Sequence, residues 1–220
     1  MMYQGEEDAM SSDEHTWQLI HAERTRLADM LEGLTPEQWA APSLVKGWNV
    51  HLAAAHIMKS GEQTLAMFLS GLVKSGFRFN VMIDRDLHEV GRLSPPEIIA
   101  RLRARTTTTN KPPAPTVAML GEVVIHGYDI RFPLGIADDS AGEARMACLE
   151  MFKASTFPVP SKKRIAGLKL NATDATWSTG TGPEVHGPVQ SLLLAMTGRP
   201  AGLAALSGEG VATLRGRIAT

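Results

Sequence analysis

The chain has 220 residues, of which 44% are hydrophobic and 20% are charged, so it is long enough to bury a core in a globular protein. Because 22 Lys and Arg side chains are balanced by 23 Asp and Glu side chains, the net charge of −1 provides no basic field for phosphate backbones or anionic lipid. We therefore expect no nucleic-acid partner. No apolar run reaches the roughly 20 residues that cross a bilayer, so we expect no membrane span. The single cysteine, Cys148, cannot form an internal disulfide, which favours a cytoplasmic protein.

Helical spacing dominates the first 135 residues. Residues 1–14 are polar and acidic, and we expect them to be disordered. Apolar residues at steps of three, seven and four predict a helix over 15–31. Two capping-box sequences, Thr35–Gln38 and Ser94–Glu97, predict helix starts with proline at the first helical position. Further helices are predicted over 48–72, 76–92 and 116–131.

The pattern of apolar and polar residues changes after residue 135. One more helix is predicted over 140–154, followed by a proline-containing linker. Strand signals then appear at 168–173, around Trp177 and at 211–218, with a helix predicted over 188–196. We therefore expect a mainly α plus α/β fold with two domains: an antiparallel helix bundle over 15–135 and a small mixed α/β domain over 136–220.

Three side chains in the predicted bundle carry metal-binding chemistry. Glu122 and His126 are four residues apart in one predicted helix, so both project from the same, otherwise apolar face. His56 lies among alanines in another predicted helix. Two imidazoles and one carboxylate would hold one divalent metal and leave a coordination position open, which is the arrangement of catalytic zinc sites. On spacing alone two other readings stay open: a hydrogen bond between Glu122 and His126, and a satisfied core histidine at His56.

Longer stretches of the sequence resemble the mycothiol-dependent maleylpyruvate isomerase family, whose N-terminal domain belongs to the DinB-like metal-binding superfamily. The resemblance rests on these segments: Leu34–Trp39, Pro42–Leu44, Gly47–Val50, Ala54–Ile57, Gly121–Ile130 and Arg131–Gly135. A C-terminal stretch, from Gly167 to Arg199, is similar to the small α/β, sterol-carrier-like domain of the same family. The likeness covers nearly all of the chain from about residue 15, in the expected order.

The resemblance implies a ligand set, cofactors and a reaction. His56, Glu122 and His126 fall on the three metal-ligand positions, zinc is the expected ion, and mycothiol is the expected thiol cofactor. In the name-giving isomerase, the thiolate adds to the cis double bond of maleylpyruvate, the resulting single bond rotates, and elimination releases the trans product. The family also places an arginine of the small domain near the site. Arg199 is our candidate for this catalytic arginine, with Arg215 and Arg217 left open.

Other polar and aromatic residues near these motifs have less specific interpretations. Asp129 lies seven residues after Glu122, so it is either a partner of the site or an ordinary exposed carboxylate. His51 points about 140° away from His56 around the helix, and we expect a solvated side chain there. Trp39 and Trp48 are expected to pack.

Two functions from different classes remain. The first is a metal- and thiol-dependent enzyme that isomerises a small electrophile or transfers a thiol to it. The alternative is a metal-anchored binding module that sequesters a thiol or an apolar ligand without turnover. The partners expected are therefore a low-molecular-weight thiol and a small molecule. The sequence does not determine the oligomeric state, and a monomer is compatible with it.

Overall fold

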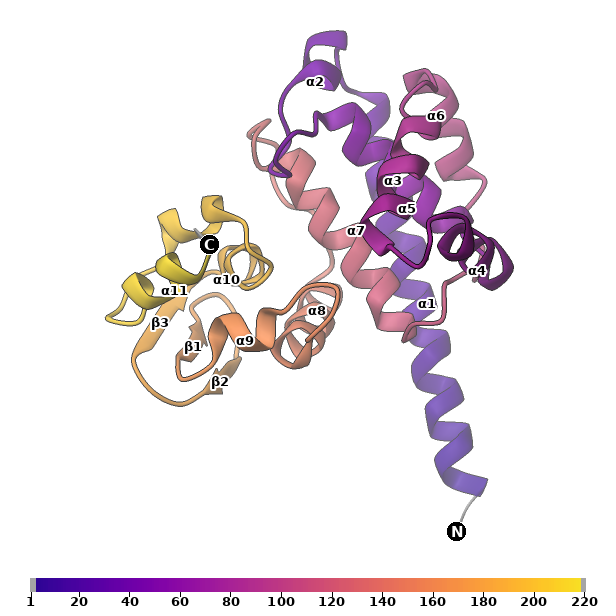
Figure 1. The fold of residues 1–220 in the computed structure, drawn as a ribbon. Helices are drawn as coiled ribbons and strands as arrows, with labels where there is room; N and C mark the ends of the chain where they lie inside the picture. The colour runs from indigo at the N-terminus through magenta and orange to yellow at the C-terminus, as the bar shows by residue number, and fades with distance from the viewer. Residues whose placement is uncertain (1–2, 219–220) are drawn as a thin grey trace. The chain divides into compact units, whose positions relative to one another are not determined.

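The computed structural model describes residues 3–218, with side chains from Ser12 onward, and divides them into two compact units, Met1–Ala141 and Gly142–Thr220. Their elements are coloured along the chain in Figure 1. The N-terminal unit contains α1 (Tyr3–Glu32), α2 (Pro36–Ala40), α3 (Val50–Glu62), α4 (Leu65–Lys74), α5 (Phe79–Val90), α6 (Pro95–Arg103) and α7 (Thr116–Arg131). The C-terminal unit contains α8 (Gly142–Ala154), α9 (Ser161–Ile165), β1 (Lys169–Ala172), β2 (Ser178–Gly180), β3 (Glu184–Gly187), α10 (Val189–Met196), the 3-10 helix η1 (Pro200–Ala205) and α11 (Val211–Ile218).

The N-terminal unit is a bundle in which α1, α3, α6 and α7 pack side by side (Figure 1). Helix α7 is the most deeply placed, because it packs against both α1 and α3 and is buried around most of its circumference. Fully or almost fully buried side chains from all four helices form the core, including Ile20, Leu27, Leu31, Ile57, Met58, Ile98, Leu102, Leu120 and Ile130. The predicted mainly helical domain is confirmed.

Local sequence signals start several of these helices as expected. At α2 the Thr35 hydroxyl accepts the backbone N–H of Gln38, and the Gln38 side chain accepts the backbone N–H of Thr35. Ser94 and Glu97 form the same reciprocal capping box at α6. The helix predicted over 116–131 is found with those bounds.

The prediction of one long helix over 48–72 is wrong, because this segment contains two helices, α3 and α4. The chain leaves the helical conformation at Gln63, which has φ −69° and ψ 113°. Thr64 then caps a new helix, since its hydroxyl accepts the backbone N–H of Met67. A threonine before an apolar run is a recognisable helix start, but the surrounding Ala, Leu and Met residues mask it.

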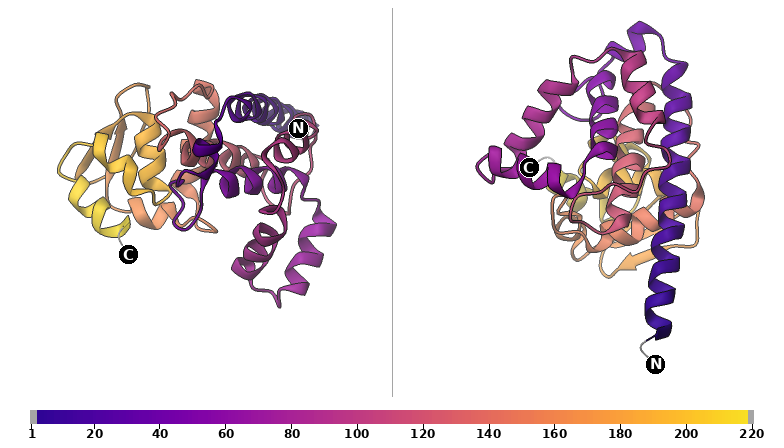
Figure 2. Two further views of the ribbon diagram at one scale, coloured as in Figure 1. Left: turned by 90° about the horizontal axis from the view of Figure 1, so that it is seen from above. Right: turned by 90° about the vertical axis from the view of Figure 1, so that its right-hand side faces the viewer.

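Helix α1 begins at Tyr3 and therefore runs through most of the segment for which we expect disorder. Figures 1 and 2 show that its N-terminal part extends beyond the other helices of its own unit. The first two residues lie outside the described part of the chain. The disorder of residues 1–14 stays a prediction. Between residues 3 and 218 every helix is too short or too polar to span a bilayer.

The C-terminal unit is built on a three-stranded mixed sheet with strand order β2-β1-β3. Strand β1 pairs antiparallel with β2 and parallel with β3, where Leu170 lies opposite Val185. The turn after β2 requires glycine: Gly180 has φ +78°, and a Cβ there would lie 2.2 Å from the carbonyl oxygen of Leu168. Buried α10 packs on α8 and η1 and supplies six of the buried hydrophobic residues of this unit, more than any other element.

The prediction that residues 211–218 close this sheet is wrong. The segment forms helix α11, and the third strand is β3. Its larger apolar residues, Val211, Leu214 and Ile218, are three and four positions apart, which is helical spacing. Only Leu214 of this segment is fully buried. A half-buried strand would instead bury every second side chain.

Candidate metal centre

Helix α7 carries two of the three predicted ligands on one face. A run of prolines ends immediately before α7, and the helix then continues without a break through Glu122 and His126. Their i, i+4 spacing brings Glu122 Oε1 to 3.7 Å from His126 Nε2. Both side chains are half-buried in a helix whose other positions are mostly fully buried. The pair therefore forms a small polar site on a helix that is otherwise mostly apolar.

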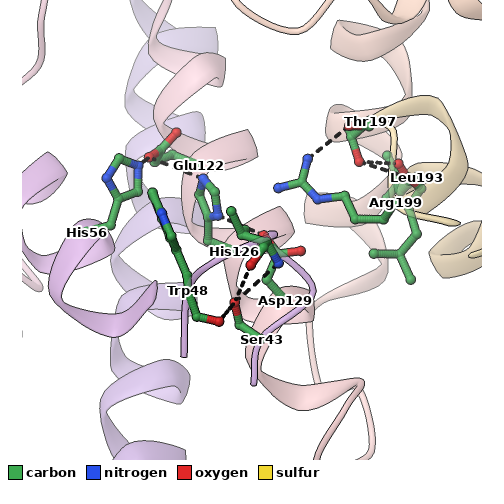
Figure 3. A network of polar contacts seen from close by, with 11 residues as sticks. Ser43, Trp48, His56, Glu122, His126, Asp129, Leu193, Thr197 and Arg199 are labelled. Carbon is green, nitrogen blue, oxygen red and sulfur yellow. Dashed lines mark hydrogen bonds and ion pairs between the residues drawn. The ribbon is translucent and has the colours of Figure 1, made fainter. Parts of the chain in front are cut away.

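The third predicted ligand reaches this spot from α3. Asn49 caps α3 by accepting the backbone N–H of Leu52, which sets where the helix starts. Seven residues later His56 points toward α7, and its Nε2 lies 2.5 Å from Glu122 Oε1 (Figure 3). One donor atom from each of His56, Glu122 and His126 lies within 4.8 Å of the other two. The tertiary structure thus brings together all three residues that the sequence suggested.

The donor set fits a divalent metal chemically. Zinc accepts imidazole nitrogen and carboxylate oxygen at about 2.0–2.2 Å, so two ligands of a tetrahedral ion are separated by roughly 3.4 Å. The 3.7 Å between Glu122 and His126 matches this separation closely. The 2.5 Å between His56 and Glu122 is a short hydrogen-bond distance, so these two side chains would separate by about 1 Å to hold an ion.

Asp129 orients one of the histidines. Its side chain is fully buried, and its Oδ2 lies 2.8 Å from Nδ1 of His126. An ionised Asp129 carboxylate can only accept, and in that state His126 donates through Nδ1 and keeps the lone pair of Nε2 for the side facing Glu122. The alternative of an exposed carboxylate at this position is therefore excluded. The i, i+3 spacing from His126 was a usable sequence signal for this contact.

Trp48 forms an aromatic wall of the centre. Its ring centroid lies 5.1 Å from that of His56 and 6.0 Å from that of His126, and it is stacked at 22° on the latter. The two imidazoles meet edge to face at 4.9 Å. Trp48 does pack, as expected, but against the candidate ligands themselves. No spacing rule links it to them, because it precedes α3 in a loop.

Two other histidines, His51 on α3 and His21 on α1, serve the structure of the bundle. We expect a solvated side chain at His51, but its Nε2 lies 2.8 Å from the carbonyl oxygen of Leu93. Its ring also meets the ring of Trp39 edge to face. His21 makes a similar contact with the carbonyl of Thr108. These rings fasten loops onto helices and lie outside the donor cluster.

A buried arginine fastens the same loop. Arg24 is only 2% exposed and donates to the carbonyls of Arg105 and Thr108. Burial lowers the pKa of its guanidinium to about 10, which still leaves the group charged at neutral pH. Both carbonyls lie in the turn and loop that follow α6, so the guanidinium holds this segment against α1.

The three candidate arginines of the C-terminal unit have different surroundings within that unit. Arg199 donates to the carbonyl of Thr197 in the turn after α10 (Figure 3). Arg217 donates to the carbonyls of Arg164 and Ala166, so it fastens α11 to the end of α9. Arg215 is exposed. The catalytic assignment of Arg199 stays a prediction.

The helical unit, with its cluster of two histidines and one glutamate, is a candidate metal-binding helix bundle. Residues 20–114 match the family model described as the mycothiol maleylpyruvate isomerase N-terminal domain. The match includes His56 and ends before Glu122 and His126.

Solved structures support the fold of the whole chain. The mycothiol-dependent maleylpyruvate isomerase superposes with a TM-score of 0.61 at 14% identity, over 90% of this chain and 92% of that chain. A histidine-to-alanine mutant of the mycothiol-dependent maleylpyruvate isomerase gives a TM-score of 0.58 over the same shares, also at 14% identity. At this identity the likeness establishes the fold, which confirms the predicted fold class. Among curated protein sequences none matches this chain.

Proposed function

We propose that this chain is a metal- and thiol-dependent enzyme that isomerises a small electrophilic substrate or transfers a thiol to it. The observation that carries the proposal is the convergence of His56, Glu122 and His126, from two helices, on one point beside Trp48. In this proposal the three side chains hold one divalent metal, and zinc suits their mixed nitrogen and oxygen donors.

A bound divalent cation would lower the pKa of a coordinated thiol and so supply a thiolate near neutral pH. Mycothiol is the thiol that the match to the family model suggests. The residues of the chain itself have separate tasks. Asp129 holds the His126 ring with Nε2 directed at the donor cluster, and Trp48 covers one side of both imidazoles with an apolar surface.

The substrate proposal follows the relatives whose names state maleylpyruvate isomerisation. A substrate of this kind carries carboxylates, and a guanidinium binds a carboxylate with two parallel hydrogen bonds. We assign this task to Arg199, within a two-domain enzyme composed of residues 15–135 and 136–220. A cis double bond next to a carbonyl is the electrophile that a thiolate attacks, so cis-trans isomerisation and thiol transfer share their first step.

The deciding experiment measures turnover by the metal-loaded protein with mycothiol, first with maleylpyruvate and then with a panel of small electrophiles. Thiol-dependent and metal-dependent turnover of any of these supports the enzyme. If the protein binds metal and mycothiol with full occupancy and converts none of them, the sequestering module replaces the enzyme. A control without thiol separates the proposed chemistry from simple metal-assisted hydration of the substrate.

A further inference from the structure

Exposed apolar side chains are concentrated in one short segment of the N-terminal unit. Of the eight exposed large hydrophobic residues in the described part of the chain, six lie between residues 65 and 81. We call this set the α4 surface; it consists of Leu65, Met67, Leu69, Val73, Phe77 and Val81. In Figure 2 the pair α4 and α5 extends to one side of the bundle helices of its own unit. Such a concentration marks an interaction site more often than chance exposure.

The side of α4 that meets the rest of the protein carries the half-buried Phe68 and Leu72 on either side of Gly71, and further apolar side chains remain on its exposed side. Gly71 is the only fully buried residue of α4, and a Cβ there would lie 3.1 Å from Sδ of Met82 in α5. Leu65, Leu69 and Val73 are 51%, 50% and 62% exposed and follow each other at intervals of four. A row of side chains at this spacing is the ridge that packs into the groove of another helix. The exposed face is therefore shaped for a helical partner.

The size of the α4 surface approaches that of a protein interface. Met67 lies two positions from both Leu65 and Leu69 and therefore on another side of α4. With about 200 Å² for a fully exposed large side chain, the other five residues present roughly 550 Å², which is within the range of the largest patch on an ordinary monomer. A standard interface buries about 800 Å² on each partner. The α4 surface and its immediate rim thus provide close to the area that one side of a stable dimer needs.

The charges of this segment do not prevent pairing with a second copy of the same chain. Between residues 63 and 83 there is no acidic side chain, and the two cations, Lys74 and Arg78, lie at the C-terminal end of α4 and just beyond it. In an antiparallel pair centred on Leu69, the two copies of Lys74 lie at opposite ends of a ten-residue helix, roughly 15 Å apart. That separation exceeds the screening length of about 8 Å at physiological ionic strength.

We infer that the α4 surface is the interface of a homodimer in which α4 packs antiparallel against α4 of a second copy around Leu69. An isologous contact of this kind is the commonest symmetry of soluble oligomers. An anionic membrane is the competing occupant. Two cations contribute only about 1 kcal/mol each at such a surface, and a bilayer does not require a ridge of four-residue spacing.

The test is the concentration dependence of the mass of the full-length protein in sedimentation experiments. The parent should reach twice the 23.7 kDa mass of one chain. Leu69→Glu buries a charge at the centre of the interface and should weaken the dimer by at least ~100-fold. Phe157→Glu is the matched control, because Phe157 is 72% exposed and lies in the other unit. It should leave the dimer unchanged. Circular dichroism checks that each variant is folded.

A cross-linking experiment tests the geometry separately. Cys148 is buried, so Leu69→Cys introduces a thiol on the proposed symmetry axis, and mild oxidation should give a covalent dimer. Val73→Cys, one turn away from the axis, should not link to itself. The inference is overturned by a monomer at all concentrations up to about 100 μM, or by a dimer that Leu69→Glu leaves intact. It is also overturned if the parent is monomeric and binds phosphatidylglycerol vesicles through Leu69.

Discussion

The Nδ1 atom of His126 lies 2.8 Å from Oδ2 of Asp129, whose side chain is fully buried in the helical unit. This contact fixes the direction in which the second nitrogen of the ring presents its lone pair. A metal centre built on His126 therefore depends on a residue that does not touch the ion. The consequences of this arrangement, and of the three converging donors, are open to direct measurement.

We expect about one divalent metal per chain, because three donors on two facing helices define one site. The variants His56→Ala, Glu122→Ala and His126→Ala should each lose most of this metal in elemental analysis. His51→Ala is the control, since His51 binds a backbone carbonyl instead. Ligand variants that stay as metal-replete as the parent would show that these side chains form only a hydrogen-bonded cluster.

Asp129→Asn should weaken metal binding by about 10–100-fold, because an amide is a poorer acceptor for the Nδ1–H of His126 and leaves Nε2 less basic. Titration with zinc and a competing chelator measures this affinity. Thermal unfolding without metal separates the effect from a loss of folding. If Asp129→Asn lowers the melting temperature but leaves zinc affinity unchanged, the contact serves only the fold.

Binding of zinc should change the tryptophan fluorescence of the protein, because the Trp48 ring lies against both candidate imidazole ligands. Trp48→Phe should remove most of this change while keeping an apolar wall. In contrast, Trp177→Phe should keep the fluorescence change, since Trp177 donates a hydrogen bond to Glu150 within the C-terminal unit. A zinc-dependent signal that survives in Trp48→Phe and disappears in Trp177→Phe would place the metal elsewhere.

Arg199→Ala should lower turnover of an anionic substrate without releasing metal, since the guanidinium is assigned to the substrate and not to the ion. We expect a loss of about 10–100-fold in kcat/KM, as for removal of a charged hydrogen bond in a partly dehydrated site. Arg215→Ala, at an exposed position of the same unit, is the matched control. Equal kinetics of Arg199→Ala and the parent would remove Arg199 from the mechanism.

The capping box of α6 should make stability depend on pH. Hydrogen bonds from the side chain and backbone of Ser94 hold the pKa of the Glu97 carboxyl below its usual value of 4.5. A carboxyl with a lowered folded-state pKa stabilises the fold above its unfolded pKa, and this contribution is lost as pH falls through the folded value. The stability difference between the parent and Glu97→Gln should thus be present at about pH 6 and fade below about pH 4.5. In a Ser94→Ala background this fading should be smaller, because only the backbone N–H at position 94 then still donates to the carboxylate.

The sequence by itself determined the features that depend on neighbours along the chain. The capping boxes at Thr35 and Ser94 and the bounds of α7 follow from side chains three or four residues apart. The same spacing placed Glu122 and His126 on one face. Two segments carried competing local signals, and their structure was harder to predict. At Thr64 a helix cap interrupts a segment of strong helix formers. Residues 211–218 form a helix in which a single leucine is fully buried.

Only the tertiary structure decided the contacts between segments that are far apart in the sequence. His56 meets Glu122 across two helices, Trp48 covers both imidazoles from a loop, and residues 184–187 take the third position of the sheet beside β1. Burial of Asp129 likewise depends on the segments that surround α7, and its backbone carbonyl accepts the N–H of Leu44 from one of them. The physical reason is that such contacts are set by the packing of whole helices and strands, whose free energy sums over many distant residues and leaves no periodic trace in the sequence.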